Sequence, residues 1–121
     1  MLPPTSAGPL EVRAVRVRPA VVGRIRPKDL NVVFQRLEID PAERFDLVVA
    51  TNVFVYYGTF EQCLALANLG RMTAQGGLLL SNDALLELPG STMRSVGHTT
   101  VVYSDRADDG DHVVFYQRQK D

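Results

Sequence analysis

The sequence predicts an α/β domain whose sheet is mostly parallel and ends in an antiparallel β-hairpin. Three observations support this fold class. Residues 45–50 form a short apolar run rich in β-branched residues, which is typical of a parallel strand buried on both faces. An amphipathic helix follows it and leads into a second apolar run at 78–80. Two β-rich runs, 99–104 and 112–118, are then joined across Asp109-Gly110, a strong hairpin signal.

Length and composition limit the class of protein. A chain of 121 residues fits one small domain, and 45% hydrophobic with 22% charged residues is a globular composition. The formal net charge of −1 does not indicate a nucleic-acid partner. Cys63 is the only cysteine, so no internal disulfide can form and a reducing compartment is expected. No apolar run approaches the roughly 20 residues of a membrane span and no signal peptide is evident, so we expect a cytoplasmic protein.

Residues 1–30 are predicted to form a basic N-terminal arm that is partly disordered. The first ten residues are rich in proline and glycine. Residues 11–18 alternate valine with arginine, the pattern of a half-buried strand, which a proline then cuts short. The arm holds six Lys and Arg against two acidic residues, whereas residues 31–121 hold seven against twelve. A solvated segment is expected, with contact to an acidic surface or a phosphate as the alternative.

The domain proper is expected to span residues 31–121. Residues 31–39 are predicted to form a strand that Pro41 stops. Residues 85–97 contain Pro89-Gly90 and little periodicity, which favours a loop.

The helix after residues 45–57 has the clearest local signals. Thr59 at the N-cap and Gln62 three residues later match a capping box. Gly76-Gly77 is predicted to end the helix. Apolar residues at i, i+3, i+4 and i+7 predict a buried stripe, which two leucines widen. The stripe consists of Phe60, Cys63, Leu64 and Ala67, widened by Leu66 and Leu69.

Polar residues follow the strand at 45–50 at once. Thr51 and Asn52 come directly after it, and ligands of open parallel sheets bind beyond the carboxyl ends of the strands. Asn52 is therefore a candidate ligand contact. The alternative is that Asn52 only closes a turn with its own side chain.

Spacing disfavours three other chemistries. The acidic residues at 105–111 lack the alternation and the closing glutamate of a calcium loop, so an acidic hairpin turn is expected. His98 and His112 are not at zinc-ligand spacing and no nearby cysteine joins them. Cys63 lies on the apolar face of the helix and is expected in the core rather than as a nucleophile. We therefore expect no metal site.

The run from Phe45 to Val53, the helix after it and the strand that begins at Gly76-Gly77 together resemble the C-terminal half of a class I S-adenosylmethionine-dependent methyltransferase. The sequence Asn-Val-x-Val-Tyr-Tyr at 52–57 is most similar to the chemotaxis-receptor methyltransferase branch. The resemblance covers roughly residues 30–118. It implies a partial Rossmann-like methyltransferase fold, with a fourth strand, a helix, a fifth strand, and a hairpin of the sixth and seventh strands.

The resemblance also implies S-adenosylmethionine as the cofactor and roles for individual residues. Glu38 and Ile39 match positions that border the adenine, where an acceptor can read its edge and an apolar side chain can cover its face. Asn52 and Val53 match positions near the amino-acid part of the cofactor and the transferred methyl group. Core or rim packing is the alternative for the two tyrosines among the substrate-side positions. These substrate-side positions are Tyr56, Tyr57, Ser81 and Asn82.

The chain departs from the family on its N-terminal side. The glycine-rich loop that holds the methionine end of the cofactor is absent, because no Gly-x-Gly occurs. The acidic residue that holds the ribose has no counterpart, because the candidate strand at 11–18 ends in Arg18-Pro19. Methyl transfer depends mostly on positioning the reactants, so loss of this half should remove most activity.

Two hypotheses follow. The first is S-adenosylmethionine-dependent methyl transfer by a truncated or split enzyme with an unknown methyl acceptor. The alternative is a non-catalytic interaction module that pairs through an exposed sheet edge. One helix cannot cover both faces of an apolar sheet, so we expect self-association or a partner that supplies the missing N-terminal half.

Overall fold

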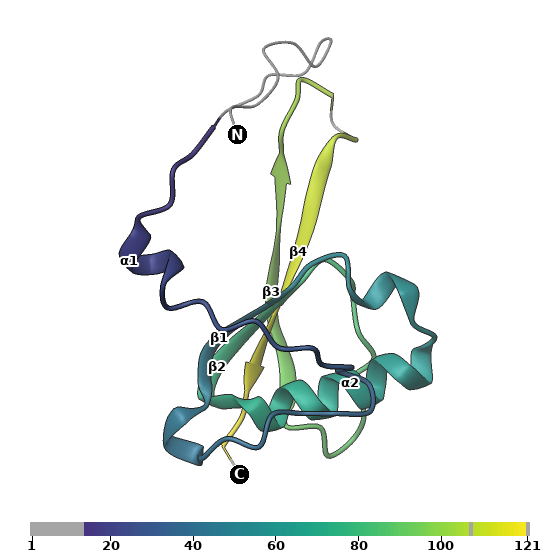
Figure 1. The fold of residues 1–121 in the computed structure, drawn as a ribbon. Coiled ribbons are helices and arrows are strands. Elements are labelled where there is room, and N and C mark those ends of the chain that lie inside the picture. The colour runs from purple at the N-terminus through teal and green to yellow at the C-terminus, as the bar shows by residue number, and fades with distance from the viewer. Residues whose placement is uncertain (1–13, 107, 121) are drawn as a thin grey trace.

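A four-stranded sheet covered on one face by a helix forms the centre of the molecule (Figure 1). The structure is a computed structural model that describes residues 14–106 and 108–120. The sheet order is β1-β2-β4-β3. β1 and β2 are parallel, whereas β2 with β4 and β4 with β3 are antiparallel. The strands are β1 (Phe45–Ala50), β2 (Thr73–Ser81), β3 (Met93–Val102) and β4 (Gly110–Arg118).

The prediction of a mostly parallel sheet is therefore wrong. Helix α2 (Thr59–Met72) returns the chain once, so it creates one parallel pair, with Leu47 opposite Leu78. The C-terminal hairpin then pairs with β2 through β4, which adds two antiparallel pairs. The predicted strand at 45–50 and the predicted order of strand, helix, strand and hairpin are confirmed.

α2 begins one residue earlier than its sequence predicts. Gly58 is the N-cap, and its amide donates to the Oε2 atom of Glu61 at 2.9 Å. The predicted pair of Thr59 and Gln62 is thus wrong by one residue. A carboxylate is favoured near the positive end of the helix dipole, whereas Gln62 is used elsewhere.

The buried face of α2 also differs from the predicted stripe. Phe60 is 75% exposed, and Ala67 is exposed as well. α2 passes directly into β2 at Thr73, so its C-terminal half determines which side rests on the sheet. The two leucines that widened the stripe are buried. The buried residues of α2 are Ala65, Leu66, Leu69, Gly70 and Met72.

Gly76 and Gly77 lie inside β2 instead of ending the helix. The β1–β2 register shifts between the pairs Phe45–Thr73 and Leu47–Leu78, so β2 bulges here. Gly76 takes a φ of 75°, which glycine adopts without strain. A Cβ atom on Gly77 would lie 2.9 Å from the carbonyl oxygen of Ala74. The two glycines therefore allow the backbone of β2 to form this bulge.

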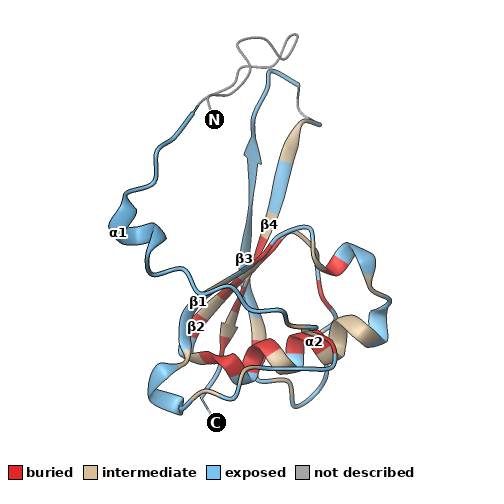
Figure 2. Cartoon of the chain, in the orientation of Figure 1, coloured by how far each residue is buried: buried red, intermediate tan, exposed pale blue. Residues whose placement is uncertain are grey.

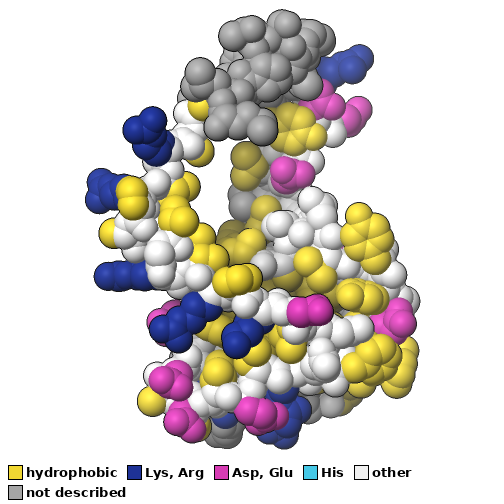
Figure 3. Space-filling model, viewed as in Figure 1, with side chains coloured by type: hydrophobic (Ala, Val, Ile, Leu, Met, Phe, Trp, Pro, Cys, Tyr) yellow, Lys and Arg dark blue, Asp and Glu magenta, His cyan; other side chains and the backbone are white. Residues whose placement is uncertain are grey.

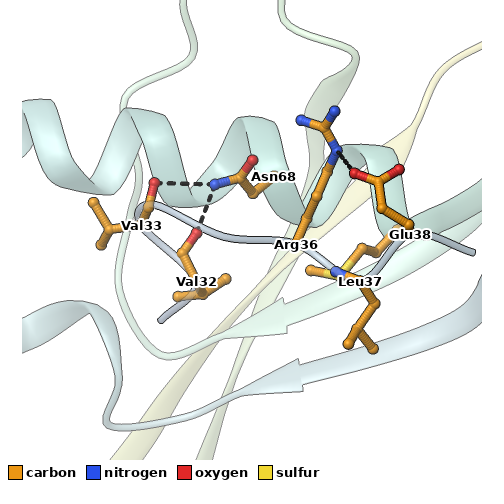
Figure 4. A network of polar contacts seen from close by, with 7 residues as sticks. Val32, Val33, Arg36, Leu37, Glu38 and Asn68 are labelled. Atoms are coloured by element: carbon orange, nitrogen blue, oxygen red, sulfur yellow. Dashed lines mark hydrogen bonds and ion pairs between the residues drawn. The ribbon is translucent and has the colours of Figure 1, made fainter. Parts of the chain in front are cut away.

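Residues 31–39 do not form the predicted strand. They form a turn at 32–34 and then an extended segment without a ladder (Figure 4). The side chain of Asn68 donates to the carbonyl oxygens of Val32 and Val33 at 2.8 and 3.0 Å. The amide of Leu37 contacts the sulfur of Met72 at 3.3 Å. Contacts with α2 thus replace strand pairing, because no described strand lies beside this segment.

Residues 14–29 of the N-terminal arm are solvent-exposed. Residues 14–18 form no strand, and Pro19–Val22 forms the short helix α1; residues 11–13 of the predicted strand lie outside the described residues. Figure 3 shows Lys and Arg side chains along this segment, interleaved with hydrophobic ones. The described valines of the arm are exposed by 50% or more, so they do not cover the sheet.

The predicted hairpin is confirmed and is longer than expected. β3 begins at Met93, inside the region predicted as a loop, and pairs with β4 from Met93–Arg118 to Val102–Gly110. Met93 is fully buried and pairs at the far end of the ladder. Burial of this side chain fixes the start of β3, which periodicity alone did not indicate.

The core lies between α2 and one face of the sheet (Figure 2). Tyr116 is the largest side chain in it and is 2% exposed. Its hydroxyl accepts a hydrogen bond from the Leu85 amide at 2.6 Å and donates to the Leu85 carbonyl at 3.4 Å. Burial raises the pKa of Tyr116 above its ordinary value, more than its bond to Leu85 lowers it. This hydroxyl ties the segment after β2 to the core.

The other face of the sheet is bare. On β1, Phe45, Leu47 and Val49 are 42%, 54% and 60% exposed, whereas Ala50 is buried. Leu47 and Val49 pair with Leu78 and Leu80 of β2, which are half-buried, so the apolar row continues across the sheet and is most exposed on β1. The apolar run at 45–50 is therefore not covered on both faces.

Replacing Tyr116 with phenylalanine should destabilise the chain by about 1–3 kcal/mol at neutral pH, because the buried Leu85 amide loses its acceptor. The folded pKa lies above the unfolded value of about 10, so the stabilising effect is complete below that pH and is lost as pH rises through the folded pKa. Urea unfolding at pH 8 to 11 should show that the free energy of unfolding falls more steeply with pH for the natural chain than for Tyr116→Phe. The same pH dependence in both proteins would contradict the role assigned to the Tyr116 hydroxyl.

We propose that the bare face causes association. Sedimentation at micromolar concentration should show dimers or larger species, because an apolar face and an unpaired edge strand favour contact. Val49→Lys should shift the chain toward monomer. Val21→Lys, on the exposed arm, is the matched control. A sharp monomer peak with cooperative unfolding of the natural chain would contradict this proposal.

Candidate functional site

Two asparagines join the carboxyl ends of β1 and β2. The amide of Asn52 donates to the Oδ1 atom of Asn82 at 2.9 Å, and the Nδ2 atom of Asn82 donates to the Oδ1 atom of Asn52 at 2.9 Å. Asn52 has a φ of 57°, a left-handed conformation that asparagine tolerates. We call this pair the asparagine clasp. The clasp joins two strands. It therefore differs from the alternative, in which the Asn52 side chain only closes the turn that follows its own strand.

The residues after Asn52 lead away from the clasp through a short 3₁₀ helix, η2 (Phe54–Tyr56). Phe54 is fully buried and anchors this turn. The Nε2 atom of Gln62 donates to the carbonyl oxygens of Phe54 and Tyr57 at 3.0 and 3.1 Å. Tyr56 is 81% exposed, whereas Val53 and Tyr57 pack against the core. Tyr57 thus has the packing role that was the alternative for it, and Tyr56 extends into solvent.

Ser81 does not face solvent. It is fully buried, and its hydroxyl donates to the Asp83 carbonyl and accepts from the Asp83 amide, both at 3.0 Å. The Oδ2 atom of Asp83 is buried without a hydrogen-bond partner among the described residues. Asp83 was not among the predicted site residues. The sequence could have indicated it, because an acidic residue just after a strand lies at the edge of the sheet where ligands bind.

Glu38 and Ile39 lie at the opposite edge. Leu37 contacts Met72, the last residue of α2, and the chain then passes through the 3₁₀ helix η1 (Pro41–Glu43) into the amino end of β1. The six residues of β1 span about 20 Å, so the structure does not bring Glu38 and Ile39 together with the clasp. Figure 4 shows Glu38 beside Arg36, with Nε and Oε1 3.5 Å apart.

The hairpin brings together two histidines that are far apart in the sequence. The ring centroids of His98 and His112 are 5.0 Å apart, and Nδ1 of His112 lies 3.1 Å from the hydroxyl of Thr100. Cross-strand register creates this pair, so spacing along the chain could not reveal it. Within residues 14–106 and 108–120, no group of three or more His, Cys, Asp or Glu is placed to hold a metal ion. None of the described helices has the length and apolar character needed to cross a bilayer.

The left-handed backbone of Asn52 determines which substitutions are informative. Asn52→Ala should be about 1 kcal/mol less stable than Asn52→Gly, because only the former places a Cβ in that conformation. Both variants remove the same side-chain hydrogen bond with Asn82. Urea unfolding measures the difference. Equal stabilities would show that the backbone relaxes and that Asn52→Ala is usable as a test of ligand contact.

A known protein resembles this chain in fold, at low sequence identity. No protein-family model and no curated protein matches the chain. Among solved structures, the N-methyltransferase NodS from Bradyrhizobium japonicum WM9 matches with a TM-score of 0.50 and 18% identity, over 75% of this chain and 58% of NodS. NodS in complex with S-adenosyl-L-homocysteine gives a TM-score of 0.48 and 19% identity, over 75% of this chain and 53% of NodS. The chain thus spans little more than half of NodS, and at this identity the likeness shows a partial methyltransferase-like fold.

Proposed function

We propose that this chain carries the C-terminal half of a class I S-adenosylmethionine-dependent methyltransferase domain. The sequence at 52–57 is most similar to the chemotaxis-receptor branch of that family. The chain would contribute to methyl transfer once the N-terminal half of the cofactor site is supplied. The observation that carries the proposal is the asparagine clasp at the carboxyl edge of the parallel pair. This edge is where ligands bind in open α/β sheets. The likeness of the fold to NodS supports the same arrangement of elements.

The clasp leaves the side-chain NH2 group of Asn52 for a ligand. Asn52 uses its backbone amide and its Oδ1 atom with Asn82, and its Nδ2 atom has no hydrogen bond among the described residues. This amide group would donate to the carboxylate of the cofactor's amino-acid part, beside Val53. The exposed Tyr56 would lie on the acceptor side. The methyl group of the cofactor is carried on a sulfonium, which leaves as a neutral thioether, so the protein would act mainly by alignment.

The adenine side requires a rearrangement. Glu38 and Ile39 are proposed adenine contacts, yet they lie at the amino edge of the sheet. To reach the same cofactor, residues 31–39 would have to leave Asn68 and Met72 and pair as a strand beside the missing half. Three hydrogen bonds to α2 and the burial of Val33 in the core hold the segment, so the missing half would have to offer comparable contacts.

An interaction module is the second candidate function. β1 is an edge strand of the sheet, and its exposed Phe45, Leu47 and Val49 form an apolar row beside that edge. A partner strand could pair with the backbone of β1 and cover this row, as in β-augmentation. The two candidates differ in their need for cofactor.

Calorimetry with S-adenosylhomocysteine tests the first candidate. The isolated chain should bind weakly or not at all, because the proposed contacts lie at two edges of the sheet and no Gly-x-Gly loop is present. Joined to a segment that carries such a loop and the acidic strand end, the chain should bind, and Asn52→Gly should weaken binding about tenfold. Gln75→Ala, exposed at the amino end of β2, is the control.

Micromolar binding by the isolated chain would show that the chain itself supplies the missing contacts. An Asn52→Gly variant that binds like the natural protein would argue against the clasp as the ligand contact.

A further inference from the structure

A cavity of about 550 Å³ lies beside α2, away from the asparagine clasp. Its walls come from α2, from the segment after β2 and from residues at the ends of strands. Arg44 directly precedes β1, Arg71 is in the last turn of α2, and Arg118 ends β4. All three arginines therefore lie at the amino edge of the parallel pair. The cavity is a place separate from the proposed methyltransferase site.

The cavity is positively charged. It has three arginines in its lining, and no Asp or Glu among the described lining residues. Arg118 uses its Nη1 atom to bind the carbonyl oxygens of Gly70 and Thr73, at 2.7 and 2.9 Å, so it supports the end of α2. Arg44 and Arg71 are the two arginines that would bind a ligand. No carboxylate of the described residues forms an ion pair with Arg44 or Arg71.

Arg44 also has an unmet polar atom. Its Nε is buried and has no hydrogen-bond partner among the described residues. A buried N–H donor without an acceptor is unfavourable, and a carboxylate or phosphate offers acceptors that match the guanidinium. The lining also has apolar side chains, among them Leu66, Leu86 and Leu88. Cys63, half-buried, lies in the same lining.

We propose that this cavity binds a small organic anion, a carboxylate or phosphate carried on an apolar body. Arg44 and Arg71 bind the anionic group, and the leucines of the lining contact the apolar body. The volume and the combination of arginines with apolar side chains fit such a molecule better than they fit an inorganic ion. The inference is independent of the proposed methyl transfer, because it uses none of the residues at the carboxyl edge.

Cys63, the only cysteine of the chain, reports on occupancy. The probe is octanoate, with octan-1-ol as its neutral match, and the readout is the rate at which a neutral dipyridyl disulfide modifies the thiol. Octanoate should slow this reaction to a saturable limit, and octanol at the same concentration should not. Arg71→Gln should raise the octanoate concentration needed by about tenfold, because it removes one charge-assisted contact. Arg24→Gln, on the exposed arm, should leave it unchanged.

Arg44→Gln is the second variant, with circular dichroism to confirm that it folds; Arg71 is exposed, so its replacement leaves the core intact. Equal protection by octanol would show that apolar contact alone is involved and would overturn the proposal. Protection that is the same in the natural chain and both cavity variants would overturn it too. So would the absence of any protection by octanoate in the natural chain.

Discussion

The packing of α2 on a single face of the sheet is the interaction on which the rest of the structure depends. Leu66, Leu69 and Met72 of the helix bury their side chains in one cluster with Leu79 and Tyr116 of the sheet. Full burial of each such side chain contributes roughly 1.5–3 kcal/mol relative to exposure. Because α2 continues into β2 without a loop, this packing also sets where β2 begins. The hydroxyl of Thr73, bonded to the Leu69 carbonyl at 2.7 Å, secures that junction.

The same packing explains why the sheet is one-sided. A single long helix covers the face that carries Ala50 and Leu79, and no described element covers the row of Leu47 and Val49. Both candidate functions would make use of this property. A methyltransferase half would cover the row when the other half joins it, and an interaction module would use the row and the β1 edge for a partner. The two differ in what occupies the carboxyl edge.

The parallel pair separates two chemically different edges. At the carboxyl edge, the asparagine clasp presents neutral donors and acceptors, and a buried carboxylate oxygen of Asp83 lies nearby in sequence. At the amino edge, arginines and leucines line a cavity. About 20 Å of β1 lies between them. Ligands at the two edges would not compete for side chains.

Local patterns in the sequence determined β1, α2 as a helix, the run at 78–80 and the hairpin, because alternation, turn residues and capping act between near neighbours. The partial methyltransferase-like fold also followed from their order. Tertiary structure alone decided which side of α2 is buried, because that side depends on where β2 departs. It also decided that 31–39 is no strand, because a strand needs a neighbour to pair with. The clasp of Asn52 with Asn82, the contact of His98 with His112 and the arginine cavity join residues from different elements, so only the folded chain brings them together.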